Sequence, residues 1–140
     1  MIRLSRGLAK EIRRHGETAY PNEACGLLIG RWSGTDCLVS RVIESANLAA
    51  EPAHRFEVDP AVRFAAMRAL RGGPEDIVGH YHSHPDGEAM PSDTDYAMTY
   101  EPEMVWLILA VKAGAAAELA AHRVDMEAGR FRRAELEVTV

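Results

Sequence analysis

The first apolar positions of the chain repeat at a helical period. Leu4, Leu8 and Ile12 recur every four residues, which places them on one face of a helix. This spacing predicts an amphipathic helix through SRGLAKEIRRHGETA that ends near Gly16.

The pattern then changes to that of strands. Residues 25–30 form a short apolar run bounded by glycine, as in a buried strand, and residues 36–44 alternate between apolar and polar. Ser33 and Gly34 supply a turn between the two segments. We therefore expect an antiparallel hairpin.

A second helix is expected to begin at Pro60, with Asp59 as its cap, after a short strand over residues 56–58. The glycine and proline residues at 72–74 should end this helix. Its predicted core face consists of Val62, Ala65, Ala66, Ala69 and Leu70.

The remaining elements complete one domain. In order, they are a strand over residues 77–82, a loop over 85–91, a short helix capped by Ser92 that runs toward Tyr100, and strands over 104–112, 118–125 and 131–140. The whole chain, residues 1–140, is thus predicted to form a single α/β (α+β) domain with a mixed central β-sheet flanked by helices.

Composition restricts the expected partners and location. A net charge of −5 argues against a nucleic-acid partner, because phosphate binding needs clustered Lys and Arg, and the basic residues 130–133 are expected to form a solvated strand face. The absence of a signal peptide or long apolar stretch predicts a cytoplasmic protein without a membrane partner. In that compartment Cys25 and Cys37 should be reduced thiols.

The stretch HYHSHP, residues 80–85, carries the strongest chemical signal. His82 and His84 are two residues apart on the predicted strand and therefore point to one side. A catalytic zinc site typically uses three protein ligands, and Asp95, in the first turn of the helix capped by Ser92, can return to the strand end as the third. The spacing predicts a metal site.

With these residues in view, the sequence resembles the JAMM (MPN+, JAB1/MPN/Mov34) zinc metalloproteases, particularly their small bacterial members. The family pattern is a glutamate near the end of the first helix followed by HS/THPx7SxxD, and here Glu23 in YPNEACGLLIG precedes HSHPDGEAMPSDTD. The resemblance implies a cytidine-deaminase-like JAB1/MPN fold. It also implies that His82, His84 and Asp95 bind Zn²⁺, that Glu23 is the general base, and that Ser92 donates to the oxyanion.

The substrates implied by this resemblance are ubiquitin-like proteins or bacterial sulfur-carrier proteins, cleaved at the amide bond after their C-terminal Gly-Gly. Residues 44–56 and 95–104 leave little room for the insertions of polyubiquitin-specific members, which favours a sulfur carrier. The identity of the released amine, whether cysteine, a peptide or a lysine side chain, stays open. The oligomeric state also stays open, and a homodimer is one of the alternatives.

A non-catalytic MPN-type binding module with a structural zinc is the alternative interpretation, although such relatives lack ligands that this chain keeps. Cys25 is expected to be a buried strand residue and His80 a structural one, and no chemical role for either follows from the pattern.

Overall fold

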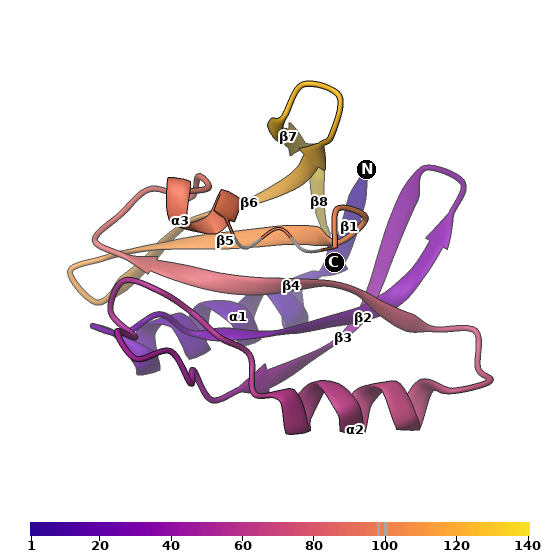
Figure 1. The fold of residues 1–140 in the computed structure, drawn as a ribbon, viewed down its shortest axis with the longest axis horizontal. Helices are drawn as coiled ribbons and strands as arrows, with labels where there is room; N and C mark the ends of the chain where they lie inside the picture. The colour runs from indigo at the N-terminus through magenta and orange to yellow at the C-terminus, as the bar shows by residue number, and fades with distance from the viewer. Residues whose placement is uncertain (98, 100) are drawn as a thin grey trace.

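The computed structural model describes residues 1–97, 99 and 101–140, and within these ranges eight strands form one sheet in the order β7-β6-β5-β4-β2-β3-β1-β8 (Figure 1). The β4–β5, β1–β3 and β1–β8 pairs are parallel and the others antiparallel, so the predicted mixed sheet is confirmed. The elements are β1 (Ile2–Ser5), α1 (Arg6–Ala19), β2 (Cys25–Ser33), β3 (Asp36–Ser45), α2 (Pro60–Leu70), β4 (Asp76–Pro85), α3 (Asp93–Ala97), β5 (Val105–Lys112), β6 (Ala115–Asp125), β7 (Arg130–Ala134) and β8 (Leu136–Thr139).

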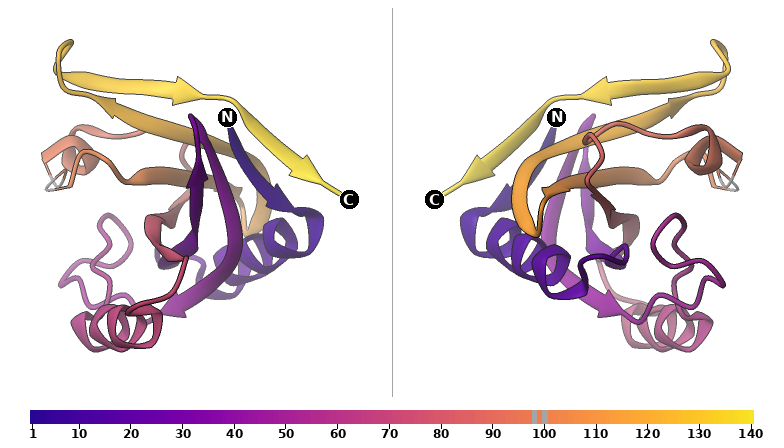
Figure 2. Two further views of the ribbon diagram at one scale, coloured as in Figure 1. Left: turned by 90° about the vertical axis from the view of Figure 1, so that its right-hand side faces the viewer. Right: turned by 90° about the vertical axis from the view of Figure 1, so that its left-hand side faces the viewer.

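Helices α1 and α2 pack on opposite faces of the sheet (Figure 2). Strand β2 shows why: Leu28 packs with Ile12 of α1, whereas Leu27 and Ile29 pack with Ala66 of α2. Successive side chains of a strand point to opposite faces, so a continuous apolar run is buried on both sides. The predicted β2–β3 hairpin is confirmed as antiparallel.

The N-terminal prediction needs correction. Leu4 belongs to strand β1, and α1 begins only after Ser5, whose hydroxyl accepts a hydrogen bond from the Leu8 backbone N–H at 3.2 Å. The helix continues to Ala19, beyond the predicted end near Gly16. Gly16 lies within the helix and is buried against β5, where a Cβ atom would come within 2.5 Å of the Leu109 side chain.

The C-terminal prediction of one strand over residues 131–140 is also wrong. The segment divides at Glu135 into β7, which pairs with β6, and β8, which pairs with β1 at the other end of the sheet. The Glu135 carbonyl accepts a hydrogen bond from the Ile2 N–H at 2.8 Å, at the point where the chain changes partner.

Helix α2 begins as predicted, with the Asp59 carboxylate accepting a hydrogen bond from the Ala61 N–H at 2.9 Å. Its predicted core face is too wide: Ala66 is buried, but Ala65 and Ala69 are exposed. The helix meets the sheet through Ala66 and the partly buried Val62 and Leu70, so only a narrow row of its side chains is covered. Residues 56–58 form no strand, and Val58 makes only an isolated bridge with Asn47.

Helix α3 follows Ser92 as expected and ends at Ala97. Of the predicted continuation to Tyr100, residues 98 and 100 lie outside the described residues, and Thr99 is not helical. Over the described ranges, no helix combines the length and apolarity that a membrane crossing requires. Cys25 and Cys37 are both buried free thiols.

Candidate metal centre

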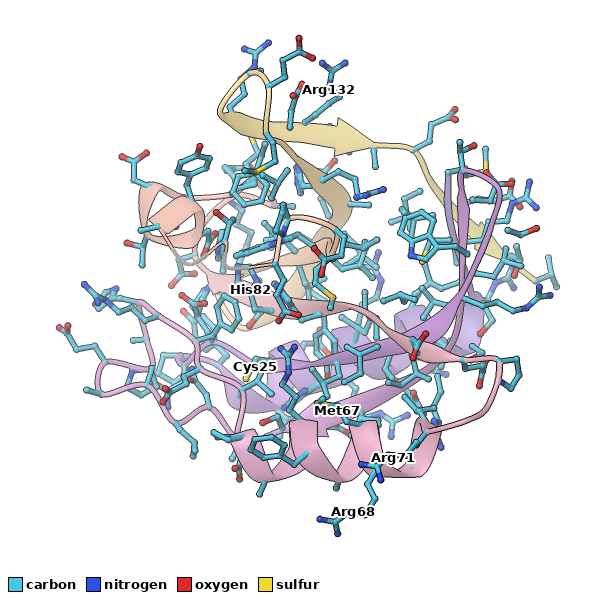
Figure 3. The ribbon with its side chains drawn as sticks, turned by 45° about the vertical axis from the view of Figure 1, so that its right-hand side comes forward. Cys25, Met67, Arg68, Arg71, His82 and Arg132 are labelled. Carbon is cyan, nitrogen blue, oxygen red and sulfur yellow. The ribbon has the colours of Figure 1, made fainter. Side chains whose placement is uncertain are left out.

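Strand β4 carries the two histidines of the site at its C-terminal end. His82 and His84 point to the same side, and their Nε2 atoms lie 3.0 Å apart. His82 is fully buried, and in Figure 3 it lies in the interior of the molecule, above Cys25 of the neighbouring strand.

Asp95 reaches the same point through a reciprocal helix cap. The Ser92 hydroxyl accepts a hydrogen bond from the Asp95 N–H at 3.0 Å, and Asp95 Oδ2 accepts one from the Ser92 N–H at 2.9 Å. This is the capping-box arrangement expected of Ser-x-x-Asp. The same Oδ2 lies 3.3 Å from His82 Nε2 and 3.1 Å from His84 Nε2, so the cap also aims the carboxylate at both imidazoles.

A loop contact orients the second imidazole. His84 Nδ1 donates its proton to the Glu88 carbonyl at 2.8 Å, which leaves the Nε2 lone pair of the neutral ring pointing toward Asp95. The Glu88 side chain is held in turn by Lys112, whose Nζ donates a hydrogen bond to Glu88 Oε1 at 2.5 Å. The loop is held further along by His122, whose Nε2–H donates to the Ala89 carbonyl at 2.8 Å.

Aromatic rings hold the first imidazole. Phe56 stacks on His82 with ring centroids 4.2 Å apart and an interplanar angle of 14°, and Trp106 meets His82 edge-on at 5.6 Å. His80 packs against Trp106 at 4.3 Å and lies outside the cluster of ligand atoms. Sequence reasoning missed Phe56, which lies in an irregular segment without a periodic pattern.

Glu23 enters from the segment between α1 and β2. Its side chain is buried. A carboxylate oxygen of Glu23 and one ring nitrogen each of His82 and His84 lie within 4.8 Å of one another. Among the described residues, Glu23 Oε1 has no hydrogen-bond partner. A buried carboxyl oxygen without a partner is costly unless a ligand occupies the space beside it.

The environment shifts the pKa values of the two carboxyl groups in opposite directions. Burial raises the pKa of Glu23 to about 8, against an opposing effect of His84. Burial acts in the same sense on Asp95, but its hydrogen bonds with His82 and His84 outweigh burial and hold the pKa of Asp95 well below its usual range. One carboxyl is thus poised to exchange a proton near neutral pH, while the other stays ionised.

The pKa values of the two imidazoles also shift in opposite directions. Burial lowers the pKa of His82, whereas for His84 the hydrogen bond and charge of Asp95 outweigh burial and raise the pKa. With both rings neutral, lone pairs of nitrogen and oxygen would converge at the centre of the cluster. Such a cluster is stabilised by a cation, so these residues form a site that can hold a metal ion.

Cys25 pairs in register with His82 on the adjacent strand β2, and its thiol lies 3.8–4.0 Å from the carbonyls of Ser45, Ala46 and Glu57. Burial raises the pKa of Cys25 to about 12, so the sulfur stays protonated at neutral pH. The thiol therefore lacks the thiolate character that a nucleophile needs.

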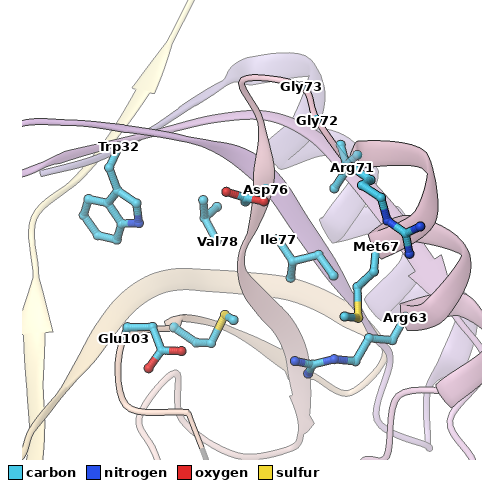
Figure 4. A pocket seen from close by; sticks show the side chains of 12 residues that line it. Trp32, Arg63, Met67, Arg71, Gly72, Gly73, Asp76, Ile77, Val78 and Glu103 are labelled. Atoms are coloured by element: carbon cyan, nitrogen blue, oxygen red, sulfur yellow. The ribbon is translucent and has the colours of Figure 1, made fainter.

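Two cavities of similar volume lie outside the ligand set His82, His84 and Asp95. A cavity of about 490 Å³ next to it includes Phe56, His80 and Trp106 in its lining. A second cavity, of about 470 Å³, lies between α2 and the start of β4 and contains none of the predicted site residues (Figure 4). The chemistry therefore lies at the strand end rather than in this second cavity.

Two imidazoles and a carboxylate around one point, with a buried carboxyl beside them, are donor groups of the kind that bind a transition metal. The comparisons agree. Residues 5–125 match Prok-JAB, the prokaryotic homologs of the JAB domain, and the chain belongs to this family.

Two curated relatives indicate the range of the family. The chain is 35% identical to desampylase from Haloferax volcanii over 88 residues, which cover 63% of this chain and 62% of that protein. It is 31% identical to the CysO-cysteine peptidase from Mycobacterium tuberculosis over 110 residues, which cover 79% of this chain and 73% of that protein. The match thus spans about three-fifths of the first relative's length and about three-quarters of the second's.

Solved structures share the fold. A protein from Desulfitobacterium hafniense superposes with a TM-score of 0.86 at 30% identity, over 99% of this chain and 93% of that chain. A JAB1/MPN domain protein from Archaeoglobus fulgidus superposes with a TM-score of 0.61 at 21% identity, over 100% and 98% of the two chains. The predicted JAB1/MPN fold is therefore confirmed.

Proposed function

We propose that residues 1–140 act as one JAB1/MPN domain, a zinc-dependent metallopeptidase that hydrolyses the amide bond after the C-terminal Gly-Gly of a ubiquitin-like or sulfur-carrier protein. The observation that carries the proposal is the convergence of His82 Nε2, His84 Nε2 and Asp95 Oδ2 within 3.0–3.3 Å, beside the buried carboxyl of Glu23.

Zinc fits this donor set best. Two neutral imidazoles and one carboxylate match the three-ligand sets of catalytic zinc sites, in which a fourth position is left for water or substrate. The hydrogen bond from His84 to the Glu88 carbonyl supplies the outer support that such ligands need. When bound, zinc would supply Lewis-acid activation of water and of the scissile carbonyl.

Glu23 is assigned the proton transfers. Its carboxyl lies within 4.8 Å of the ligand nitrogens, and its burial raises the pKa toward the range of an acid that works near neutral pH. Glu23 would take a proton from the attacking water and then deliver it to the departing amine. No covalent bond between protein and substrate is required.

Ser92 is assigned to the substrate oxygen. Its hydroxyl oxygen accepts the capping hydrogen bond from Asp95, which leaves the hydroxyl proton free to be donated. The residue is exposed, so a substrate carbonyl can approach it. The cap holds the hydroxyl in place for the negative charge that develops on that oxygen.

The relatives support a carrier-protein substrate. One is named a desampylase and another a CysO-cysteine peptidase, and both names describe cleavage of a small protein from its conjugate. The chain's net charge of −5 favours a protein partner over a nucleic acid, and a cytoplasmic location is part of the proposal. An extended Gly-Gly tail has the slim shape that a site with buried ligands admits.

The test is zinc content together with cleavage of sulfur-carrier fusions that end in Gly-Gly before a reporter peptide. Wild-type protein should bind one zinc and cleave after Gly-Gly, whereas Glu23→Gln should bind one zinc and cleave nothing. Zinc without cleavage of any fusion would refute the peptidase and favour the non-catalytic module. A protein that binds no zinc would refute the metal site itself.

A further inference from the structure

We propose that Asn47 is a positioning residue, which holds the backbone of Glu23 at its place beside the metal ligands. The inference rests on the proposed role of Glu23 in proton transfer. Within the described part of the chain, Glu23 Oε1 is buried without a hydrogen-bond partner. The location of this carboxyl oxygen therefore depends on the backbone that carries it.

The backbone N–H and carbonyl groups of Glu23 and Ala24 all make hydrogen bonds. The Glu23 N–H donates to the Pro52 carbonyl at 2.7 Å, and the Glu23 carbonyl accepts a hydrogen bond from Asn47 Nδ2 at 3.1 Å. The next residue is held by strand β4: the Ala24 N–H donates to Ser83 Oγ at 2.8 Å, and its carbonyl accepts from the Ser83 N–H at 3.0 Å. Ser83 lies between the two ligand histidines, so Glu23 and its neighbour are attached to the ligand strand on one side and to Asn47 on the other.

The Asn47 amide is itself fully bonded. Its Oδ1 accepts hydrogen bonds from the N–H groups of Ala49 and Glu57, both at 3.0 Å. Its Nδ2 donates to the Arg55 carbonyl at 2.8 Å as well as to Glu23. Carbonyls surround the nitrogen and N–H groups surround the oxygen, so the amide has one orientation.

This amide organises the irregular segment 47–57 and joins it to Glu23. Alanine would remove all of these bonds, and aspartate would place a carboxylate oxygen against the carbonyls of Glu23 and Arg55. Either change frees the Glu23 carbonyl without removing a bond of the metal ligands His82, His84 and Asp95. Asn47→Ala also removes bonds of Arg55 and Glu57, which flank the Phe56 ring that stacks on His82.

Ser45 offers a matched control at the other end of the same segment. Its buried hydroxyl accepts a hydrogen bond from the Asp59 N–H at 2.9 Å and donates to the Ala46 carbonyl at 2.8 Å. Ser45→Ala therefore loosens the segment as Asn47→Ala does, but through bonds that do not involve Glu23.

The experiment compares the kinetics of zinc-loaded wild type, Asn47→Ala, Asn47→Asp and Ser45→Ala on one carrier fusion. Displacing a reacting group by about 1 Å can cost roughly 100-fold in rate. Both Asn47 variants should lose about 10- to 100-fold in kcat, with KM within about 3-fold and one zinc retained. Ser45→Ala should keep kcat within about 2-fold although its Tm falls. Equal losses of kcat in the Ser45 and Asn47 variants would overturn the proposal.

A second readout does not need activity. In Asn47→Ala the carbonyl carbon of Glu23 should shift in its NMR resonance, and the Glu23 amide should exchange its proton at least 10-fold faster than in Ser45→Ala. An unchanged resonance and exchange rate would overturn the positioning role. If wild type cleaves no fusion, the proposed function fails, and this NMR comparison still decides whether Asn47 holds Glu23.

Discussion

Replacing Phe56 with alanine tests whether the ring that stacks on His82 supports both stability and the metal site. The Phe56 side chain is 5% exposed and also meets Trp106 edge-on at 5.9 Å. A buried phenylalanine removes roughly 150–250 Å² from water, worth about 4–6 kcal/mol at about 25 cal/mol per Å² as an upper bound. Truncations of buried phenylalanine to alanine cost about 3–5 kcal/mol, and we expect that loss here.

Phe64 is the matched control, because it is 63% exposed on helix α2. Its replacement by alanine should cost less than about 1 kcal/mol. Urea unfolding of both metal-free variants measures the difference, provided that the slope against urea stays constant.

The same variants are then titrated with zinc. Phe56→Ala should weaken zinc binding by about 10-fold, as is usual when a support of a ligand histidine is lost, and Phe64→Ala should leave it unchanged. The reasoning is refuted if the two variants unfold within about 1 kcal/mol of each other. Unchanged zinc affinity in Phe56→Ala would refute the support of His82.

Three further predictions concern the cap, the loop and the glycines. Ser92→Ala should lower kcat by roughly 10²- to 10³-fold and the free energy of unfolding by about 1 kcal/mol; Ser92→Asn should restore the stability but not the rate, and recovery of both would contradict the oxyanion role. Burial lowers the pKa of His122 below its ordinary 6.5, so at acidic pH the unfolded chain binds this proton more readily than the folded chain does. The free energy of unfolding should therefore be level above about pH 6.5 and fall as the pH drops below that value. Unfolding measured across this range should fall less steeply for His122→Gln, and parallel curves would count against the prediction. Gly26→Ala places a methyl group against a neighbouring backbone carbonyl and should lower the stability by about 3 kcal/mol or more. Gly7→Ala places its methyl group in the first turn of α1 at an ordinary contact distance of 3.8 Å from Ser5 Oγ and should raise the stability by about 0.5–1 kcal/mol. Thermal unfolding that ranks the two variants otherwise would contradict the packing described.

Close spacing made the candidate ligands predictable. His82 and His84 are brought together by strand geometry alone, and Ser92 and Asp95 by a reciprocal cap within one turn. The assignment of Glu23 came from the family pattern, and its position beside the histidines is a tertiary consequence of the chain path between α1 and β2. The chemical roles of all five residues stay predictions until they are tested.

Contacts that depend on irregular chain paths had no sequence signal. Asn47 and Phe56 lie in a segment without periodicity, and their partners are Glu23 and His82, more than 20 residues away. No local pattern predicts that an isolated asparagine will bond to several distant backbone groups or that a loop phenylalanine will stack on a histidine. Only the folded chain brings these residues together.

Two of the errors in the fold share one physical cause. Strand β1 is only four residues long, and its pairing with β3 and β8 is non-local, so Leu4 fitted a helical period equally well. Residues 131–140 alternate continuously, and alternation cannot reveal that the pairing partner changes from β6 to β1 at Glu135. Periodicity reports the exposure of side chains and not the identity of the neighbouring strand.

The central claim, that this strand end is a zinc centre, is tested most directly by anomalous diffraction from zinc-loaded crystals at the zinc absorption edge. We expect one peak at about 2.0–2.2 Å from His82 Nε2, His84 Nε2 and an Asp95 carboxylate oxygen, with the Glu23 carboxyl near it but not bonded to it. A peak at another place in the molecule, or no peak from protein that holds zinc in solution, would contradict the account.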